Sequence, residues 1–165
     1  MDDIQAYDAD ADRWTEVPTV DGPWPVAQVA MAAGPDRIVP WGGADREDEE
    51  TWIFEPATES WARSVPKPAP EPAWDACMVW AAGRMMLIGG EGPTTVEIAE
   101  GVTSRETRRR GEVKAFDLGS KVWMPLESLP DAMSGHGYAA AGGSVVVWDR
   151  DRVPVLGPAT GAASR

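Results

Sequence analysis

The chain has 165 residues, enough for one domain with a core of its own, and carries 15 Lys and Arg against 27 Asp and Glu, a net charge of −12. An acidic surface repels phosphate backbones, which excludes nucleic acid as an expected partner. The single cysteine, Cys77, excludes an internal disulfide. The chain is expected to be soluble and cytoplasmic, because the sequence shows neither a signal peptide nor an apolar run of the ~20 residues that span a membrane.

Glycine (17 residues) and proline (15 residues) recur at intervals too short for helices of ordinary length. Between them lie short runs of β-branched and aromatic residues, such as Glu112–Phe116 and Ser144–Trp148. Many short strands separated by Gly and Pro turns predict an all-β fold.

A pair of aromatic residues recurs along the chain, with a Trp seven positions after the first aromatic in every case. An acidic residue directly follows the first aromatic, and the stretch between the two rings is rich in turn-forming residues. Each pair therefore predicts two strands joined by a tight turn. The pairs are Tyr7 with Trp14, Phe54 with Trp61, and Phe116 with Trp123.

Two glycine pairs, Gly42-Gly43 and Gly89-Gly90, lie 47 residues apart, the same interval that separates Tyr7 from Phe54. Each glycine pair ends a short apolar run, and a second apolar run ending in Gly precedes it. One repeat thus consists of four strands, lettered a to d: the Gly pair ends strand b, and the aromatic and the Trp lie on strands c and d. A repeat of this length with four strands is typical of a β-propeller blade.

The combined pattern of an apolar strand, Gly-Gly, a variable loop, an aromatic and a Trp resembles the kelch repeat over nearly the whole chain. The resemblance implies a partial kelch-type β-propeller, similar to the central domain of galactose oxidase, with about three blades' worth of four-stranded antiparallel sheets. It divides this single domain into strands c and d of an incomplete blade (1–18), a blade (19–66), a blade with a long b–c loop at 91–111 (67–130) and a degenerate, incomplete blade (131–165).

The last unit departs from the repeat. Ser144–Trp148 aligns with Arg37–Trp41, but the Gly pair is missing, and Leu156 and Ala163 stand where the aromatic and the Trp are expected. A further departure is Pro40, which lies inside strand b and removes a donor from its ladder; we expect a bulge or one-sided pairing there.

Large apolar rings are expected to fill the spaces between blades. Trp61 and Trp123 on strand d are predicted to be largely buried, and Trp14 less so because its blade lacks strands a and b. Trp41 and Trp148 hold equivalent positions on strand b and are predicted to pack in the core.

A propeller ring closes with about 4–8 blades, more than these units supply. Three explanations stay open. In the first, the chain is a piece of a longer kelch protein. In the second, it forms a homodimer with a six-bladed ring, in which the Ile4–Val17 hairpin of one copy completes strands a and b at the far end of the other. In the third, it is an open stack of sheets with exposed edges.

The variable loops predict where a partner binds. In an up-and-down blade the b–c loops and the d–a connectors emerge on one face, and long loops on a rigid scaffold often carry function. The alternative to a binding role is structural. The longer b–c loop would then be a solvated hairpin whose Arg residues pair with nearby Glu, and the Trp side chains would be buried against Pro-rich connectors. The candidate binding residues lie on two connectors, an acidic b–c loop and the basic end of the longer b–c loop: Trp24, Trp74, Asp45, Glu47, Asp48, Arg105, Arg108, Arg109 and Arg110.

Metal binding finds little support in the residues. Asp8, Asp10 and Asp12 alternate as in a calcium loop, but Arg13 and Thr19 occupy the positions of the Gly and Glu that such a loop requires. The segment also coincides with a c–d turn of the repeat, so a structural role is expected.

Catalysis finds little support either, because His136 is the only histidine. The copper site of galactose oxidase uses two His and two Tyr, and it cannot be built with one His and only Tyr7 and Tyr138. Cys77 is expected to be an inert core thiol. We therefore expect no enzyme activity and no cofactor: the predicted function is a non-catalytic kelch scaffold that binds a protein or peptide. The alternative is a remnant of a galactose oxidase-like or other enzyme-associated propeller that binds carbohydrate.

Overall fold

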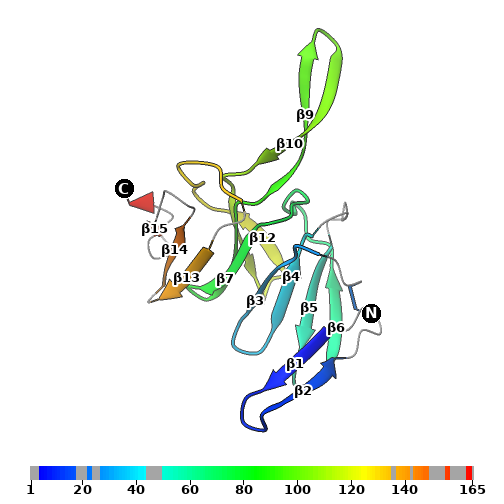
Figure 1. The fold of residues 1–165 in the computed structure, drawn as a ribbon, viewed down its shortest axis with the longest axis vertical. Coiled ribbons are helices and arrows are strands. Elements are labelled where there is room, and N and C mark those ends of the chain that lie inside the picture. Colours follow the sequence, from blue (N-terminus) through cyan, green and yellow to red (C-terminus); the bar gives the residue numbers. More distant parts are fainter. Residues whose placement is uncertain are drawn as a thin grey trace.

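The computed structural model describes residues 4–17, 22–23, 27–43, 50–134, 137–141, 143–148, 155–156 and 163–164 (Figure 1). Every regular element in these ranges is a β-strand, so the all-β prediction is confirmed, and no helix that could cross a membrane occurs in them. The strands are β1 (Ile4–Asp8), β2 (Arg13–Val17), β3 (Ala30–Ala33), β4 (Ile38–Trp41), β5 (Thr51–Glu55), β6 (Ser60–Ser64), β7 (Cys77–Ala81), β8 (Arg84–Ile88), β9 (Glu91–Ala99), β10 (Val102–Arg109), β11 (Val113–Asp117), β12 (Val122–Pro125), β13 (Gly137–Ala141), β14 (Ser144–Trp148), β15 (Val155–Leu156) and β16 (Ala163–Ser164).

The strands form antiparallel sheets of four and two. The four-stranded sheets are β3-β4-β5-β6 (sheet I), β7-β8-β11-β12 (sheet II) and β13-β14-β15-β16 (sheet III). Strands β1 and β2 form a separate N-terminal hairpin, and β9 and β10 form a second, long hairpin that projects from the body (Figure 1). The first strands of the three sheets lie together, because β7 contacts both β3 and β13. Residues 91–111, which were expected to form a long b–c loop, form mostly the long hairpin β9-β10.

One register recurs in all three sheets. Strand b pairs with strand c and strand c with strand d at the same aligned positions, including the positions that hold Leu and Ala in sheet III. Tyr7 likewise lies opposite Trp14 in the N-terminal hairpin. Along strands b, c and d the aligned residues are Ile38, Phe54 and Trp61 in sheet I, Met85, Phe116 and Trp123 in sheet II, and Val145, Leu156 and Ala163 in sheet III.

Sheet III takes its third and fourth strands from its own chain. Strands β15 and β16 have two residues each, and β15 pairs with β14. The homodimer considered among the three explanations, in which β1-β2 of one copy completes this sheet in another, would have to displace β15. A dimer that leaves sheet III intact needs a different contact.

Pro40 lies in the middle of β4 and pairs unequally with its two neighbours. The register of β4 with β3 runs through four residue pairs, whereas its register with β5 contains only Ile38 opposite Phe54. Since proline has no N–H to donate, one side of its ladder is weakened. The one-sided pairing agrees with the expectation.

The c–d turns share one backbone conformation. The residue five positions after the first aromatic has a positive φ each time, with 49° at Asp12, 50° at Glu59 and 57° at Lys121. The acidic residue after the aromatic caps the turn: the Asp8 carboxylate accepts the N–H groups of Asp10 and Ala11, at 3.0 Å each. The carboxylates of Asp8 and Asp12 therefore serve the turn, and the described residues contain no cluster suited to a metal ion.

The equivalent turn in sheet II is held in the same way. Oδ1 of Asp117 accepts the Ser120 N–H and the Ser120 hydroxyl, both at 2.7 Å. These two hydrogen bonds lower the pKa of Asp117, since they favour the charged carboxylate. In the N-terminal hairpin the Tyr7 hydroxyl donates to Asp12 at 2.6 Å, and this bond raises the pKa of Tyr7.

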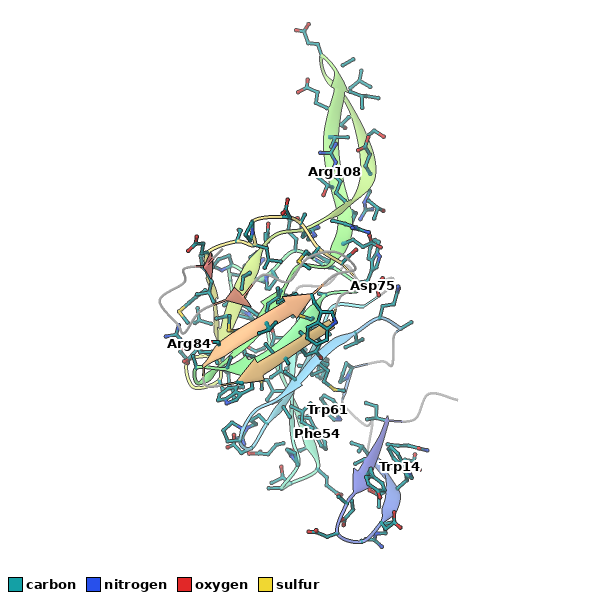
Figure 2. The ribbon with its side chains drawn as sticks, turned by 60° about the vertical axis from the view of Figure 1, so that its left-hand side comes forward. Trp14, Phe54, Trp61, Asp75, Arg84 and Arg108 are labelled. Atoms are coloured by element: carbon teal, nitrogen blue, oxygen red, sulfur yellow. The ribbon has the colours of Figure 1, made fainter. Side chains whose placement is uncertain are left out.

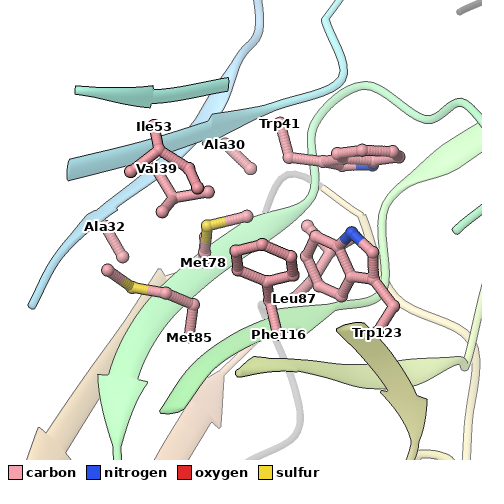
Figure 3. Packing of buried hydrophobic residues seen from close by; sticks show 10 residues of the cluster. All are labelled: Ala30, Ala32, Val39, Trp41, Ile53, Met78, Met85, Leu87, Phe116 and Trp123. Atoms are coloured by element: carbon pink, nitrogen blue, oxygen red, sulfur yellow. The ribbon is translucent and has the colours of Figure 1, made fainter. Parts of the chain in front are cut away.

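The larger core cluster lies between sheets I and II (Figure 3). Trp123 of sheet II packs edge-on against Trp41 of sheet I, with ring centroids 5.2 Å apart and an interplanar angle of 64°. Its indole N–H donates to the fully buried hydroxyl of Thr51 at 2.9 Å. Cys77, Val113 and Val147 belong to a second cluster between sheets II and III. Cys77 is buried as expected, and burial raises the pKa of its thiol to about 12.

One of the burial predictions is wrong, since Trp148 is 43% exposed although its equivalent, Trp41, is 2% exposed. Trp61 is partly exposed, and is therefore less covered than its equivalent, Trp123, which is 2% exposed. Trp41 is covered by Trp123 on strand d of sheet II, and Trp123 by Trp41 on strand b of sheet I. In the described part of the chain no sheet follows sheet III, which holds Trp148, and only β1 and β2 precede sheet I. Trp61 is covered in part by Gly22, where a Cβ would lie 2.8 Å from the indole.

Candidate functional site

The long hairpin is the most prominent surface feature of the molecule (Figure 2). Its strands pair from Glu91 opposite Arg109 up to Ala99 opposite Val102, with a bulge near the tip. Gly101 takes a φ of 71° in the connecting turn, and its N–H donates to the Glu97 carboxylate at 3.1 Å. The long hairpin, called the arm below, therefore ends in a tip turn held by a side chain of its own strand β9.

The base of the long hairpin is fixed to the connector that precedes sheet II. The backbones of Trp74 and Glu91 exchange two hydrogen bonds of 2.9 Å, and the Trp74 indole N–H donates to the Glu91 carboxylate at 3.1 Å. Trp74 is half-buried. The candidate binding residue Trp74 thus anchors the hairpin, while Trp24 lies outside the described residues.

Arg110 anchors the same base through its side chain. Its guanidinium pairs with Glu71 and donates to the carbonyl oxygens of Pro72 at 3.4 Å and Pro93 at 3.1 Å, and the side chain is 10% exposed. Gly92 leaves the space this requires, because a Cβ there would lie 2.9 Å from the guanidinium. The hydrogen bond from Arg110 lowers the pKa of Glu71.

The three remaining arginines lie on the exposed part of β10. Arg108 forms an ion pair with Glu106 at 3.0 Å on its own strand. Arg105 and Arg109 are exposed on the opposite face of the strand, since successive side chains alternate. The structure therefore separates the predicted basic cluster into one anchoring residue, Arg110, and three arginines on a projecting strand.

The acidic b–c loop of the preceding unit lies mostly outside the described residues. Asp45, Glu47 and Asp48 lie outside the described residues. Glu50, at the end of that loop, forms an ion pair with Arg63 on β6 at 2.8 Å. Its carboxylate is directed to its own sheet.

The glycine pairs bring the connectors and the b–c segments to the same end of the sheets. The Gly43 N–H donates to the Ala73 carbonyl at 3.0 Å, and the Gly90 N–H donates to the Met133 carbonyl at 2.8 Å. A Cβ on Gly42, whose φ is 68°, would lie 2.1 Å from the Ala73 oxygen. Only glycine allows this approach, so the pair fastens each sheet to the connector of the next.

Sequence reasoning missed the acidic partners of the anchor. Glu71 and Glu91 hold Arg110 and Trp74, yet neither belongs to a repeat position or to an acidic run. The one available signal was that Glu91 directly follows a glycine pair. Thr51, which holds Trp123, was missed for the same reason: its partner is 72 residues away.

Comparison with known proteins gives a fold likeness. No family model matches the chain, and no curated protein matches it. A solved structure titled "Structure of YjhT" is similar, with a TM-score of 0.58 and 20% sequence identity over 76% of this chain and 34% of that chain. This chain therefore spans about a third of that protein's length, and the likeness concerns the fold alone.

Proposed function

We propose that this chain forms part of a kelch-type β-propeller that acts as a non-catalytic binding scaffold for a protein or peptide. The common register of sheets I to III and the glycine pairs that fasten each sheet to the next connector support the propeller assignment. A rigid stack of this kind holds loops in fixed positions, which is what a binding surface requires.

The observation that carries the proposal is a projecting arm with a fixed base. The long hairpin stands clear of the sheets, and its base is held by Arg110 and Trp74. Its tip exposes the apolar side chains of Ile98 and Val102. An isolated hairpin is marginally stable in water, so an arm that is anchored but uncovered is suited to contact with another molecule.

The chemistry of β10 indicates the kind of partner. Strand β10 carries Arg105 and Arg109 on one face and Arg108, paired with Glu106, on the other, next to an apolar tip, in a chain whose net charge is −12. Such a surface complements a segment that carries acidic and apolar residues. Support for a carbohydrate ligand from Trp74 is limited, because stacking on a sugar uses an exposed ring face and this indole is half-buried.

The test is a selection from a random-peptide display library on the wild-type protein. Peptides rich in Asp and Glu are expected to be enriched. The triple variant Arg105→Gln, Arg108→Gln, Arg109→Gln should bind them about 10- to 100-fold more weakly at low salt, because each exposed pair contributes ~0.5–1 kcal/mol. The loss should shrink at high salt, where charges are screened within a few Å.

The matched control neutralises acidic residues of the same arm, Glu97→Gln and Glu100→Gln. This variant should bind the selected peptides at least as tightly as the wild type. If the peptides bind the triple arginine variant as tightly as the wild type at every salt concentration, the arm is not the binding surface.

A further inference from the structure

The contact between sheets I and II has two complementary halves. Trp123 on strand d of sheet II packs against Trp41 at the end of strand b of sheet I. Both rings are 2% exposed. Sheet I thus offers a strand-b position to the unit that follows it, and sheet II offers a strand-d position to the unit that precedes it.

Sheet III presents the strand-b half uncovered. Trp148 aligns with Trp41, because Val145 and Ile38 hold the same register position three residues earlier. Its indole packs on Gly137 of the neighbouring strand, where a Cβ would lie 2.2 Å from the ring. The side chain is nevertheless 43% exposed, so part of the ring faces solvent.

The N-terminal hairpin presents the strand-d half uncovered. Trp14 aligns with Trp123 and packs on Tyr7 with a centroid distance of 5.1 Å and an angle of 45°, against 5.0 Å and 42° for Phe116 and Trp123. The aromatic pair thus has the geometry of the buried one. Trp14 is nevertheless 66% exposed, and every residue from 5 to 16 is exposed.

The two uncovered halves differ in charge. Residues 1–17 contain one basic and six acidic residues, a net charge of −5. The described residues of sheet III contain no Asp, Glu, Lys or Arg. Sheet III therefore offers the acidic hairpin an apolar surface without like charge, whereas two copies of the acidic hairpin repel each other.

We propose that copies of this chain associate head to tail, with Trp14 of one copy packing against Trp148 of the next as Trp123 packs against Trp41. This contact leaves β15 and β16 in place, unlike the exchange of strands considered from the sequence. It is independent of the proposed binding function, because the long hairpin takes no part in it. A head-to-tail contact is heterologous, so it produces a closed ring or an open chain of copies.

Sedimentation velocity of the wild-type protein over a concentration series tests the proposal. The mass is expected to rise above the 17.7 kDa of one chain. Trp14→Ala and Trp148→Ala should each weaken self-association by about 30-fold or more, the effect of removing a central interface residue. Ile98→Ala, at another exposed apolar residue, is the matched control and should associate as the wild type does.

Mixing the two tryptophan variants gives the sharper test. Neither variant alone can form the Trp14–Trp148 contact, but an equimolar mixture contains one intact Trp14 and one intact Trp148, so a species of two chains should appear. Trp14→Ala carries the test by itself if Trp148→Ala fails to fold, since Trp14 lies on a hairpin exposed along its length. A wild type that stays monomeric up to ~1 mM, or association that both variants leave unchanged, would overturn the proposal.

Discussion

The contrast between Trp123 and Trp14 tests the packing of the sheets, because the two residues hold the same repeat position in different surroundings. A Trp buries about 150–250 Å², and at ~25 cal/mol per Å² the nearly complete burial of Trp123 corresponds to about 4–6 kcal/mol. Core substitutions of this size cost about 3–5 kcal/mol in practice. Trp123→Ala should therefore lower the free energy of unfolding by at least ~3 kcal/mol, whereas Trp14→Ala should cost less than ~2 kcal/mol since two thirds of it is already exposed.

Urea denaturation followed by far-UV circular dichroism measures both losses, at a protein concentration low enough to exclude self-association. With a slope of ~1–3 kcal/mol per M, the Trp123→Ala midpoint should fall by at least ~1 M. If that variant does not fold, Trp123→Phe keeps most of the apolar area but leaves the Thr51 hydroxyl without its partner, at a cost of ~1–3 kcal/mol. Equal midpoints for Trp123→Ala and Trp14→Ala would refute the packing argument.

Four further outcomes can be measured, three by denaturation and one by thiol labelling. Arg110→Gln should destabilise the protein by ~1–3 kcal/mol because it leaves the partly buried carbonyl oxygens of Pro72 and Pro93 without this donor. Arg109→Gln should change stability by less than ~0.5 kcal/mol, and equal effects would contradict the anchoring role. The pKa of Glu71 is lower in the folded state than its ordinary value of 4.5, so its contribution is present above that pH and lost as the pH falls below it; the stability difference between the wild type and Glu71→Gln should shrink in acid, and a constant difference would contradict the ion pair. Lys121→Gly should stabilise by ~0.5–1 kcal/mol, since relief of the positive φ outweighs the added chain entropy, and Gly101→Ala should have the opposite sign. The Cys77 thiol, whose pKa is about 12, should react with a thiol reagent at pH 8 only as fast as the protein opens, and immediate labelling of the native protein would show that it is not buried.

The repeat could be read from the sequence because its signals are local. The aromatic and Trp of each pair lie seven positions apart and face each other across one turn, so their spacing alone predicts the hairpin. The same reasoning placed Leu156 and Ala163 in the register of sheet III, even though neither has the expected side chain. The one-sided pairing of Pro40 was predictable because proline has no N–H to donate.

The candidate site was less predictable because it depends on partners distant in the chain. Four consecutive or nearly consecutive arginines look alike in the sequence, yet Arg110 reaches Glu71, 39 residues earlier, while Arg108 pairs within its own strand. Trp74 was expected near the mouth of a binding surface and instead donates to Glu91. Nothing local distinguishes an anchoring side chain from an exposed one.

The sequence by itself determined the strands, turns and register of the repeat, since these depend on alternation, glycine, proline and turn chemistry within one repeat. It did not indicate β9 and β10, which lie in a segment expected as a loop. Tertiary structure alone decided which of the equivalent tryptophans on strand b is buried, whereas the missing strands of the first unit had already indicated that Trp14 is less covered than Trp123. Trp41 and Trp148 hold the same place in their sheets, as do Trp123 and Trp14, but one of each two is covered and the other is exposed. Burial is a property of two surfaces in contact, and the second surface comes from a neighbouring sheet that the residue's own repeat does not encode.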